Sequence, residues 1–273
     1  MISKSFHYMT KTWMILTFVF LYLPIVTIVV MSFNKTAYGL FPYVFTTEWY
    51  KVLFTTSSLV DSAVRSLEFS AIVTVAAVII GTITALGMQS FTPKWANRLS
   101  SALQLPITIP WLVTAISILL LMTFIGFGRS YFAMFFGNLV VVLPYVVLLV
   151  NGRFVAADRT PEAAARLLGA SPVRVFFDVT LPEILPGVMA GGIMSFIVCY
   201  NSFCIQYYLA PFAVYTLPVE VFTRIKTGYQ ADLNALSAVM ILVALIIVFV
   251  LSRLGYDTGS LFGGAPVKTK KGK

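Results

Sequence analysis

Residues 162–182 read Glu-Ala-Ala-Ala-Arg-Leu-Leu-Gly-Ala-Ser-Pro-Val-Arg-Val-Phe-Phe-Asp-Val-Thr-Leu-Pro, a polar, helix-forming stretch between long apolar segments. Thr160-Pro161 offers an N-cap followed by a proline at the first helical position, where no N–H is needed. Gly169 can adopt the left-handed conformation that ends a helix, and Ser171-Pro172 repeats the cap-plus-proline signal. The stretch therefore predicts two short helices joined by a glycine, the second of which ends before Leu181-Pro182.

The side chains of this helical hairpin suit contact with another surface. Glu162 complements the positive end of the first helix dipole, and the alanines at 163–165 let a partner approach closely. Arg166 and Arg174 can reach acidic residues of a partner. The apolar side chains can seat on membrane helices or in a partner's groove, and they are Leu167, Leu168, Val173, Phe176 and Phe177.

The composition is that of an integral membrane protein. Of the 273 residues, 59% are hydrophobic and 11% are charged, whereas a soluble domain carries roughly 25% charged residues. A bilayer-spanning helix needs about 20 mostly apolar residues. Long continuous apolar runs favour an all-α fold over a barrel of short alternating strands. Six segments qualify as transmembrane helices, at about 13–33, 64–90, 103–125, 131–151, 183–206 and 235–254.

The basic residues indicate how the chain is oriented. The formal net charge of +9 would suit nucleic-acid binding, but Lys and Arg beside membrane helices collect on the cytoplasmic side. With the amino terminus inside, six of the 19 Lys and Arg are external, namely Lys35, Lys51, Arg65, Arg129, Arg224 and Lys226. We therefore expect a multi-pass protein of a bacterial inner membrane with both termini cytoplasmic, contacts to lipids and no nucleic-acid partner. The first apolar segment is too long for a signal-peptide core, so we interpret it as a retained signal anchor.

The sequence lacks the residues that several kinds of chemistry need. His7 is the sole histidine, and Cys199 and Cys204 lie five apart with no second pair, so we expect no metal site. No Gly-x4-Gly-Lys-Ser/Thr sequence occurs, so we expect no cofactor on this chain and ATP with Mg on another chain. No charged residue lies deep within a predicted span, where a proton-coupled pump usually has a carboxylate. These absences favour transport without enzymatic activity, and a stand-alone secondary transporter or channel for a small solute is the alternative.

Two places within the predicted spans are candidates for a solute pathway. The third span begins Leu105-Pro-Ile-Thr-Ile-Pro-Trp111, and its prolines predict either a break of the kind that lines pathways or a packing kink. The fifth span contains the most polar stretch at membrane depth, where Ser195, Cys199, Ser202 and Gln206 share one helical face. That face could line the pathway or form interhelical hydrogen bonds. The predicted pathway residues are Trp111, Cys199, Tyr200, Asn201, Ser202 and Gln206.

The order Glu162-Ala163-Ala164, Gly169, Val179 and Leu181-Pro182 resembles the "EAA" loop of ABC importer permeases, with Val179 where the family usually has Ile. Other segments are similar to the second permease subunit of spermidine/putrescine importers, namely 31–34, 48–50, 115–117 and 233–236. The resemblance implies a type I importer permease fold of six transmembrane helices with a cytoplasmic coupling-helix loop at 152–182. It also implies that the ATPase-coupling residues are Glu162, Ala163, Ala164, Arg166, Gly169, Arg174, Leu181 and Pro182.

The resemblance further implies a second permease subunit in a heterodimer, two cytoplasmic ATPase subunits and an extracytoplasmic solute-binding protein. Polyamine-type members carry carboxylates where this chain has the neutral residues Trp111, Asn201 and Ser202. We therefore expect a small polar organic solute, either polyamine-like or a zwitterionic amine, opine or aminophosphonate, with Trp111 able to hold an ammonium group. One domain over 1–254 is expected, followed by a disordered tail at 255–273.

Overall fold

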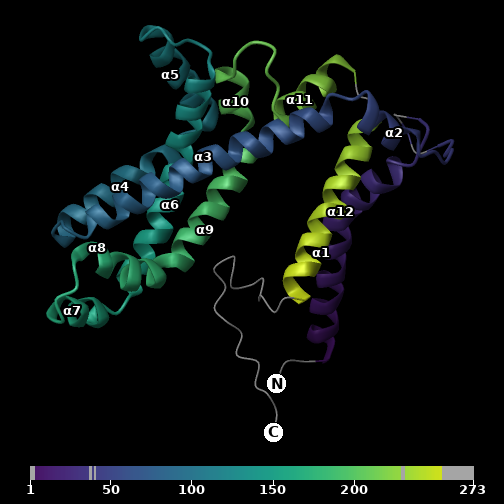
Figure 1. The fold of residues 1–273 in the computed structure, drawn as a ribbon. Coiled ribbons are helices and arrows are strands. Elements are labelled where there is room, and N and C mark those ends of the chain that lie inside the picture. Colours follow the sequence, from purple (N-terminus) through teal and green to yellow (C-terminus); the bar gives the residue numbers. More distant parts are fainter. Residues whose placement is uncertain (1–3, 37–38, 40, 229–230, 254–273) are drawn as a thin grey trace. The chain divides into compact units, whose positions relative to one another are not determined.

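The computed structural model describes residues 4–36, 39, 41–228 and 231–253, and these residues fold almost wholly into helices (Figure 1). This confirms the all-α prediction. The predicted tail at 255–273 lies outside the described residues. The elements are α1 (Lys4–Met31), α2 (Glu48–Thr55), α3 (Leu59–Met88), α4 (Pro93–Thr108), α5 (Trp111–Phe124), α6 (Tyr131–Ala156), α7 (Thr160–Leu167), α8 (Pro172–Val175), the π-helix η1 (Phe176–Thr180), α9 (Leu181–Tyr200), α10 (Phe203–Leu209), α11 (Leu217–Thr227) and α12 (Asp232–Arg253).

Within the described part of the chain, five helical stretches are long and apolar enough to cross a membrane, and the pair α4 and α5 makes up to six. The pair passes the same length and hydropathy test but bends by 99° at its break. With 16 and 14 residues, α4 and α5 are each shorter than the roughly 20 residues that a straight span needs. The break falls at Ile109 and Pro110, so of the two alternatives that the prolines left open, a break and a kink, the structure has the break. The number of candidate spans agrees with the six predicted from the sequence.

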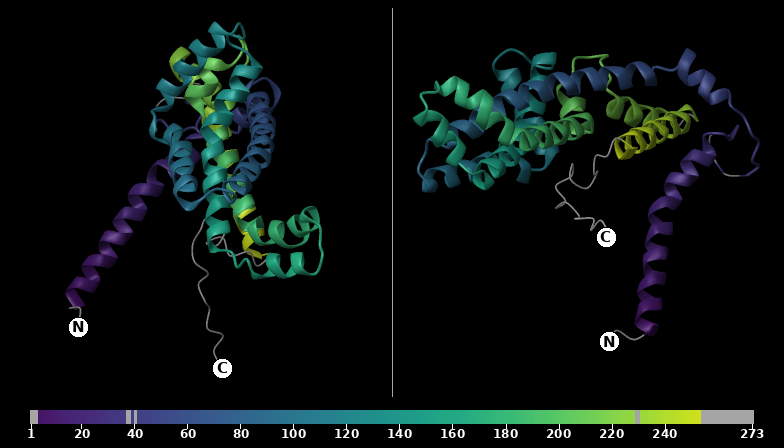
Figure 2. Two further views of the ribbon diagram at one scale, coloured as in Figure 1. Left: turned by 90° about the vertical axis from the view of Figure 1, so that its left-hand side faces the viewer. Right: turned by 60° about the horizontal axis from the view of Figure 1, so that its bottom comes forward.

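The chain divides into two compact units, which are described separately. In the unit formed by residues 63–219, α9 lies along α6 in the ribbon views (Figures 1 and 2). Glycines allow this close packing: a Cβ at Gly191 would come within 3.1 Å of the Val146 Cα, and one at Gly81 within 2.7 Å of the Val146 Cγ1. Helices α3, α6 and α9 therefore meet at Val146, which is fully buried. Small residues at such crossings are the usual basis of helix association in lipid.

The other unit contains residues 1–62 and 220–258, of which the described part includes α1, α2 and α12. Both α1 and α2 pack on α12. The segment after α1 is held in place because the Trp49 Nε1 donates to the Asn34 carbonyl at 2.8 Å, and the Ser32 and Tyr50 hydroxyls lie 2.7 Å apart. The apolar side chains of α1 are almost all exposed, as suits a helix that contacts lipid or another subunit.

Candidate functional site

The loop between α6 and α9 begins with a turn in which the Asp158 side chain bonds to Thr160, the first residue of α7. The Asp158 Oδ1 accepts hydrogen bonds from the Thr160 hydroxyl at 2.7 Å and from the Thr160 N–H at 2.9 Å. These hydrogen bonds, the hydroxyl's first, hold the pKa of Asp158 below its ordinary value, so the carboxylate is charged at neutral pH. The predicted cap at Thr160 is therefore wrong, because Asp158 is the acceptor and Thr160 is already the first residue of α7.

The turn after α7 agrees with the sequence prediction, but the helix that follows it does not. Gly169 has φ +82° and the Ser171 Oγ accepts from the Arg174 N–H at 3.4 Å, so the glycine stop and the second cap are both confirmed. The second helix does not end before Leu181: α8, η1 and α9 follow one another without a gap. The Leu181 N–H bonds to the Phe176 carbonyl, five residues back. This wider π-turn lets the helix continue into Pro182, which has no N–H to donate.

The outer side of the loop is an exposed apolar surface, which we call the docking face and define as Leu167, Leu168, Val173 and Phe177. Leu167 and Leu168 are each 89% exposed. Five of the predicted coupling residues lie exposed on the same hairpin, and these are Ala163, Ala164, Arg166, Gly169 and Arg174. Arg174 pairs with Asp178 at 3.2 Å, and both side chains remain mostly exposed. Large aliphatic side chains this open to water are typical of an interaction surface.

Between the loop and the ends of α3 and α6 lies a cleft of about 420 Å³. The predicted coupling residue Glu162 faces this cleft, where its Oε1 accepts a hydrogen bond from the Thr180 hydroxyl of η1. The Glu183 Oε1 accepts from the Asp158 N–H at 3.0 Å. These bonds close the hairpin on itself, so Glu162 shapes the loop from within while the docking face points outward.

The first candidate place of the pathway is the break between α4 and α5. Trp111 is the first residue of α5, and its half-buried side chain packs against the hydrophobic core. Helix α5 packs on α10, which follows the second break. The helices that follow the two breaks, α5 and α10, are thus in contact. Interrupted helices at membrane depth expose backbone polar groups that a solute pathway can use.

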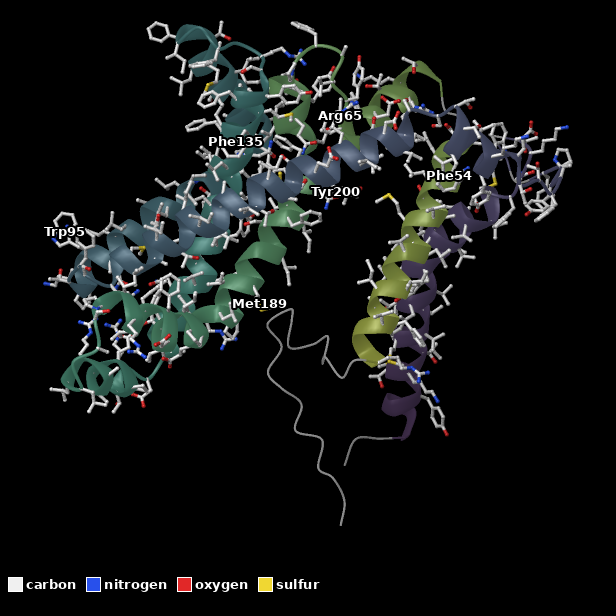
Figure 3. All side chains as sticks on the ribbon, viewed as in Figure 1. Phe54, Arg65, Trp95, Phe135, Met189 and Tyr200 are labelled. Atoms are coloured by element: carbon white, nitrogen blue, oxygen red, sulfur yellow. The ribbon has the colours of Figure 1, made fainter. Side chains whose placement is uncertain are left out.

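The second place is a break that the sequence did not predict. Helix α9 ends at Tyr200, and α10 starts at Phe203 (Figure 3 labels Tyr200). The single helical face that was predicted for the polar residues is therefore wrong, because Ser202 and Gln206 lie beyond the break. The Gln206 Nε2 reaches back and donates to the Cys199 carbonyl at 2.7 Å. The same carbonyl accepts the Ser202 N–H at 3.1 Å, so the Gln206 amide joins the turn that ends α9 to α10.

The predicted pathway residues differ in their exposure. Asn201 is exposed, Trp111 and Tyr200 are half-buried, and the other members Cys199, Ser202 and Gln206 are buried. Among the described residues, no hydrogen-bond partner is found for the buried oxygens Ser195 Oγ, Ser202 Oγ and Gln206 Oε1. Buried polar atoms without a partner are rare and call for an explanation. Hydrogen bonds between these oxygens and water or a solute in another conformation would explain why they lack a partner in this one.

Sequence reasoning also missed a buried ion cluster that joins α11 to the start of α12. Arg224 of α11 bonds to Glu220 at 2.8 Å and to Asp232 of α12, and all three side chains are at most 15% exposed. The Ser58 hydroxyl donates to Glu220 at 2.6 Å and the Ser57 hydroxyl to Asp232 at 2.9 Å. Burial lowers the pKa of Arg224, but hydrogen bonds and charge from Glu220 and Asp232 outweigh it, so the pKa is raised overall. The spacing of Glu220 and Arg224 on one helix face was the available signal.

Several membrane-crossing helices, one of them interrupted, and an exposed hairpin that leads into a span are the features of a multi-spanning transport permease. The chain belongs to the family of binding-protein-dependent transport system inner membrane components, whose family model matches residues 77–257. It is thus a permease subunit of an ABC importer, a multi-pass protein of the inner membrane.

Two kinds of known protein resemble the chain. It is 30% identical over 247 residues to the spermidine/putrescine transport system permease protein PotC of Haemophilus influenzae, covering 90% of this chain and 96% of that protein. Its fold matches a chain in the crystal structure of a bacterial ABC transporter involved in the import of the acidic polysaccharide alginate, with a TM-score of 0.69, 17% identity and coverage of 94% and 99%. It also matches the alginate transporter in complex with an alginate pentasaccharide-bound periplasmic protein, with a TM-score of 0.65, 17% identity and coverage of 92% and 95%. The type I importer permease fold predicted from the sequence is thereby confirmed.

Proposed function

We propose that a separate ATPase, carrying ATP and Mg, drives this permease by pushing on the docking face. The observation that carries the proposal is the exposure of Leu167, Leu168, Val173 and Phe177 on a hairpin that runs without a gap into α9. A surface of this kind needs a soluble partner to cover it. Because α8, η1 and α9 are continuous, a displacement of the hairpin is passed directly to a membrane span and to the second break.

The complex would contain, besides this chain, a second permease subunit in a heterodimer, two cytoplasmic ATPase subunits and an extracytoplasmic binding protein. The alginate transporter, solved with a periplasmic protein bound, supports the last of these. Both termini would be cytoplasmic, because that orientation puts the docking face and most Lys and Arg on the same side.

The solute would be a small polar organic compound that carries an amine. The polyamine permease relative supports an amine, and half-buried Trp111 at the start of α5 could hold an ammonium group through its ring. Asn201, exposed at the second break, and the unpartnered oxygens of Ser202 and Gln206 could supply hydrogen bonds. No carboxylate stands at these positions, so a zwitterionic amine, an opine or an aminophosphonate fits the pathway as well as a polyamine does.

Uptake into proteoliposomes that contain the full complex tests this proposal. Radiolabelled spermidine, putrescine and 2-aminoethylphosphonate would be offered with the binding protein outside and ATP on the ATPase side. We expect ATP-dependent accumulation of at least one of these amines, and Trp111→Ala and Asn201→Ala should change the ranking of the probes. Uptake that proceeds equally without ATP would contradict the ATP-driven role. An unchanged ranking in both variants would remove Trp111 and Asn201 from the pathway.

A further inference from the structure

Gln89 lies immediately after α3 and beside the cleft under the loop. Its half-buried side-chain amide makes hydrogen bonds in three directions. The Nε2 donates to the Ala85 carbonyl of α3 at 3.2 Å and to the Asn151 Oδ1 of α6 at 2.9 Å, and the Oε1 accepts from the Arg159 Nη2. One side chain thus connects α3, α6 and the residue that precedes α7.

The amide group suits this position for chemical reasons. A glutamine offers two donor hydrogens and an acceptor oxygen on one planar group, so it can serve a carbonyl, a second amide and a cation together. The bond from Arg159 is charge-assisted, and such bonds are roughly twice as strong as neutral ones. Arg159 is anchored in the loop in turn, because its carbonyl accepts the Ala163 N–H of α7 at 3.1 Å.

The other polar ties of the cleft stay within the loop and the helix that continues it. Glu162 bonds to Thr180, and Glu183 bonds to the Asp158 N–H. These ties keep the hairpin rigid but do not involve α3. The contact of Arg159 with Gln89 bridges 70 residues, and that of Gln89 with Asn151 bridges 62. The Gln89 amide therefore provides a side-chain route from the loop to two membrane spans.

We propose that Gln89 is a positioning residue for energy coupling, which passes the movement of the loop through Arg159 to α3 and α6. This inference rests on the proposed function, since it assumes that a partner ATPase moves the loop. Without the amide, the hairpin would still be driven, but α3 and α6 would follow it less closely.

The experiment uses the assembled complex with three variants. Gln89→Ala removes every bond of the amide, whereas Gln89→Glu keeps an acceptor for Arg159 and can still accept from Asn151 if that amide rotates. Gln104→Ala is the matched control, because Gln104 is also half-buried and its amide, among the described residues, bonds within its own helix to Ser100 at 3.4 Å. All three are made in a Cys199→Ser, Cys204→Ser background that carries Tyr131→Cys at the start of α6, where the side chain is 56% exposed.

Two readouts are compared. ATP hydrolysis reports the drive from the ATPase, and the ATP-plus-vanadate change in the rate at which an impermeant maleimide labels the Tyr131→Cys site reports the movement of α6. We expect Gln89→Ala to retain ATP hydrolysis while the labelling change falls about tenfold, as expected for loss of a charge-assisted hydrogen bond. Gln89→Glu should restore the response, and Gln104→Ala should resemble the parent. Arg159→Ala combined with Gln89→Ala should lower it no further than either change alone.

A normal labelling response in Gln89→Ala would overturn the inference. Proportional loss of hydrolysis and labelling, or failure of Gln89→Glu to restore the response, would also overturn it, because a purely structural role predicts those results. If the labelling rate of the parent complex does not change with ATP plus vanadate, the proposed function is overturned instead. The failure of the inference and the failure of the proposed function are therefore distinguishable.

Discussion

At the residue scale, the loop is held by a few groups whose geometry leaves little freedom. Gly169 has φ +82°, and no atom lies within 4 Å of the position that a Cβ would occupy there. The requirement for glycine is therefore conformational and not a matter of space. Gly169→Val should reduce coupled transport, because a side chain in the left-handed region costs about 1–2 kcal/mol. Gly169→Asn should be much milder, because asparagine tolerates that region. Equal transport by both variants in the reconstituted complex would refute this role.

The buried ion cluster predicts that two arginine variants lose different amounts of stability. Arg224→Ala would leave Glu220 and Asp232, which are 10% and 2% exposed, without their cation, and breaking a buried pair costs about 3–5 kcal/mol. Arg174→Ala removes a pair whose partners are 77% and 62% exposed, which is worth less than about 1 kcal/mol. Thermal unfolding of the detergent-purified complex should show a large drop in melting temperature for Arg224→Ala only. A drop in melting temperature for Arg224→Ala that is no larger than the drop for Arg174→Ala would mean that the cluster is not stabilising.

At the element scale, α9 depends on close contact with α6. A Cβ at Gly187 would lie 2.8 Å from the Leu149 carbonyl oxygen, which is backbone and cannot move aside, whereas one at Gly152 would meet nothing within 4 Å. Gly187→Ala should therefore destabilise the protein by about 1–3 kcal/mol. Gly152→Ala should be neutral or stabilising, since alanine favours a helix by roughly 1 kcal/mol over glycine. Melting temperatures of the two variants test this, and a tolerated Gly187→Ala would show that α9 does not pack as described.

The elements also show how far sequence reasoning reaches. The spans, the break at Ile109-Pro110 and the stop at Gly169 were predictable because local residue chemistry determines them. The break after Tyr200 was not, because no proline or glycine marks it and the Gln206 side chain that stabilises it comes from the following helix. The bonds of Gln89 join residues 62 and 70 positions apart, which no local pattern reveals. Continuity of the hairpin with α9 was missed because Leu181-Pro182 reads as a helix stop, and the π-turn removes that stop.

At the scale of the whole molecule, the proposed orientation predicts which side of the membrane each loop occupies. Leu168 and Phe212 are 89% and 80% exposed, and cysteines at these positions would report orientation in the Cys199→Ser, Cys204→Ser background. Phe212→Cys should react with an impermeant maleimide in intact cells, and Leu168→Cys only after the membrane is opened. The reverse pattern would place the docking face outside and remove the basis for an ATPase partner.

The central claim is that another chain moves this permease by acting on its loop, and a single substitution tests it most directly. Glu162→Lys removes the acceptor for the Thr180 hydroxyl and puts a cation beside Arg159 and Arg166 in the cleft. Glu48→Lys, the same change at an exposed position of α2, is the control. The measurement is ATP-driven amine uptake by proteoliposomes that contain equal amounts of assembled complex. We expect Glu162→Lys to abolish uptake and Glu48→Lys to leave uptake unchanged. Normal uptake by Glu162→Lys would show that transport is not driven through the loop.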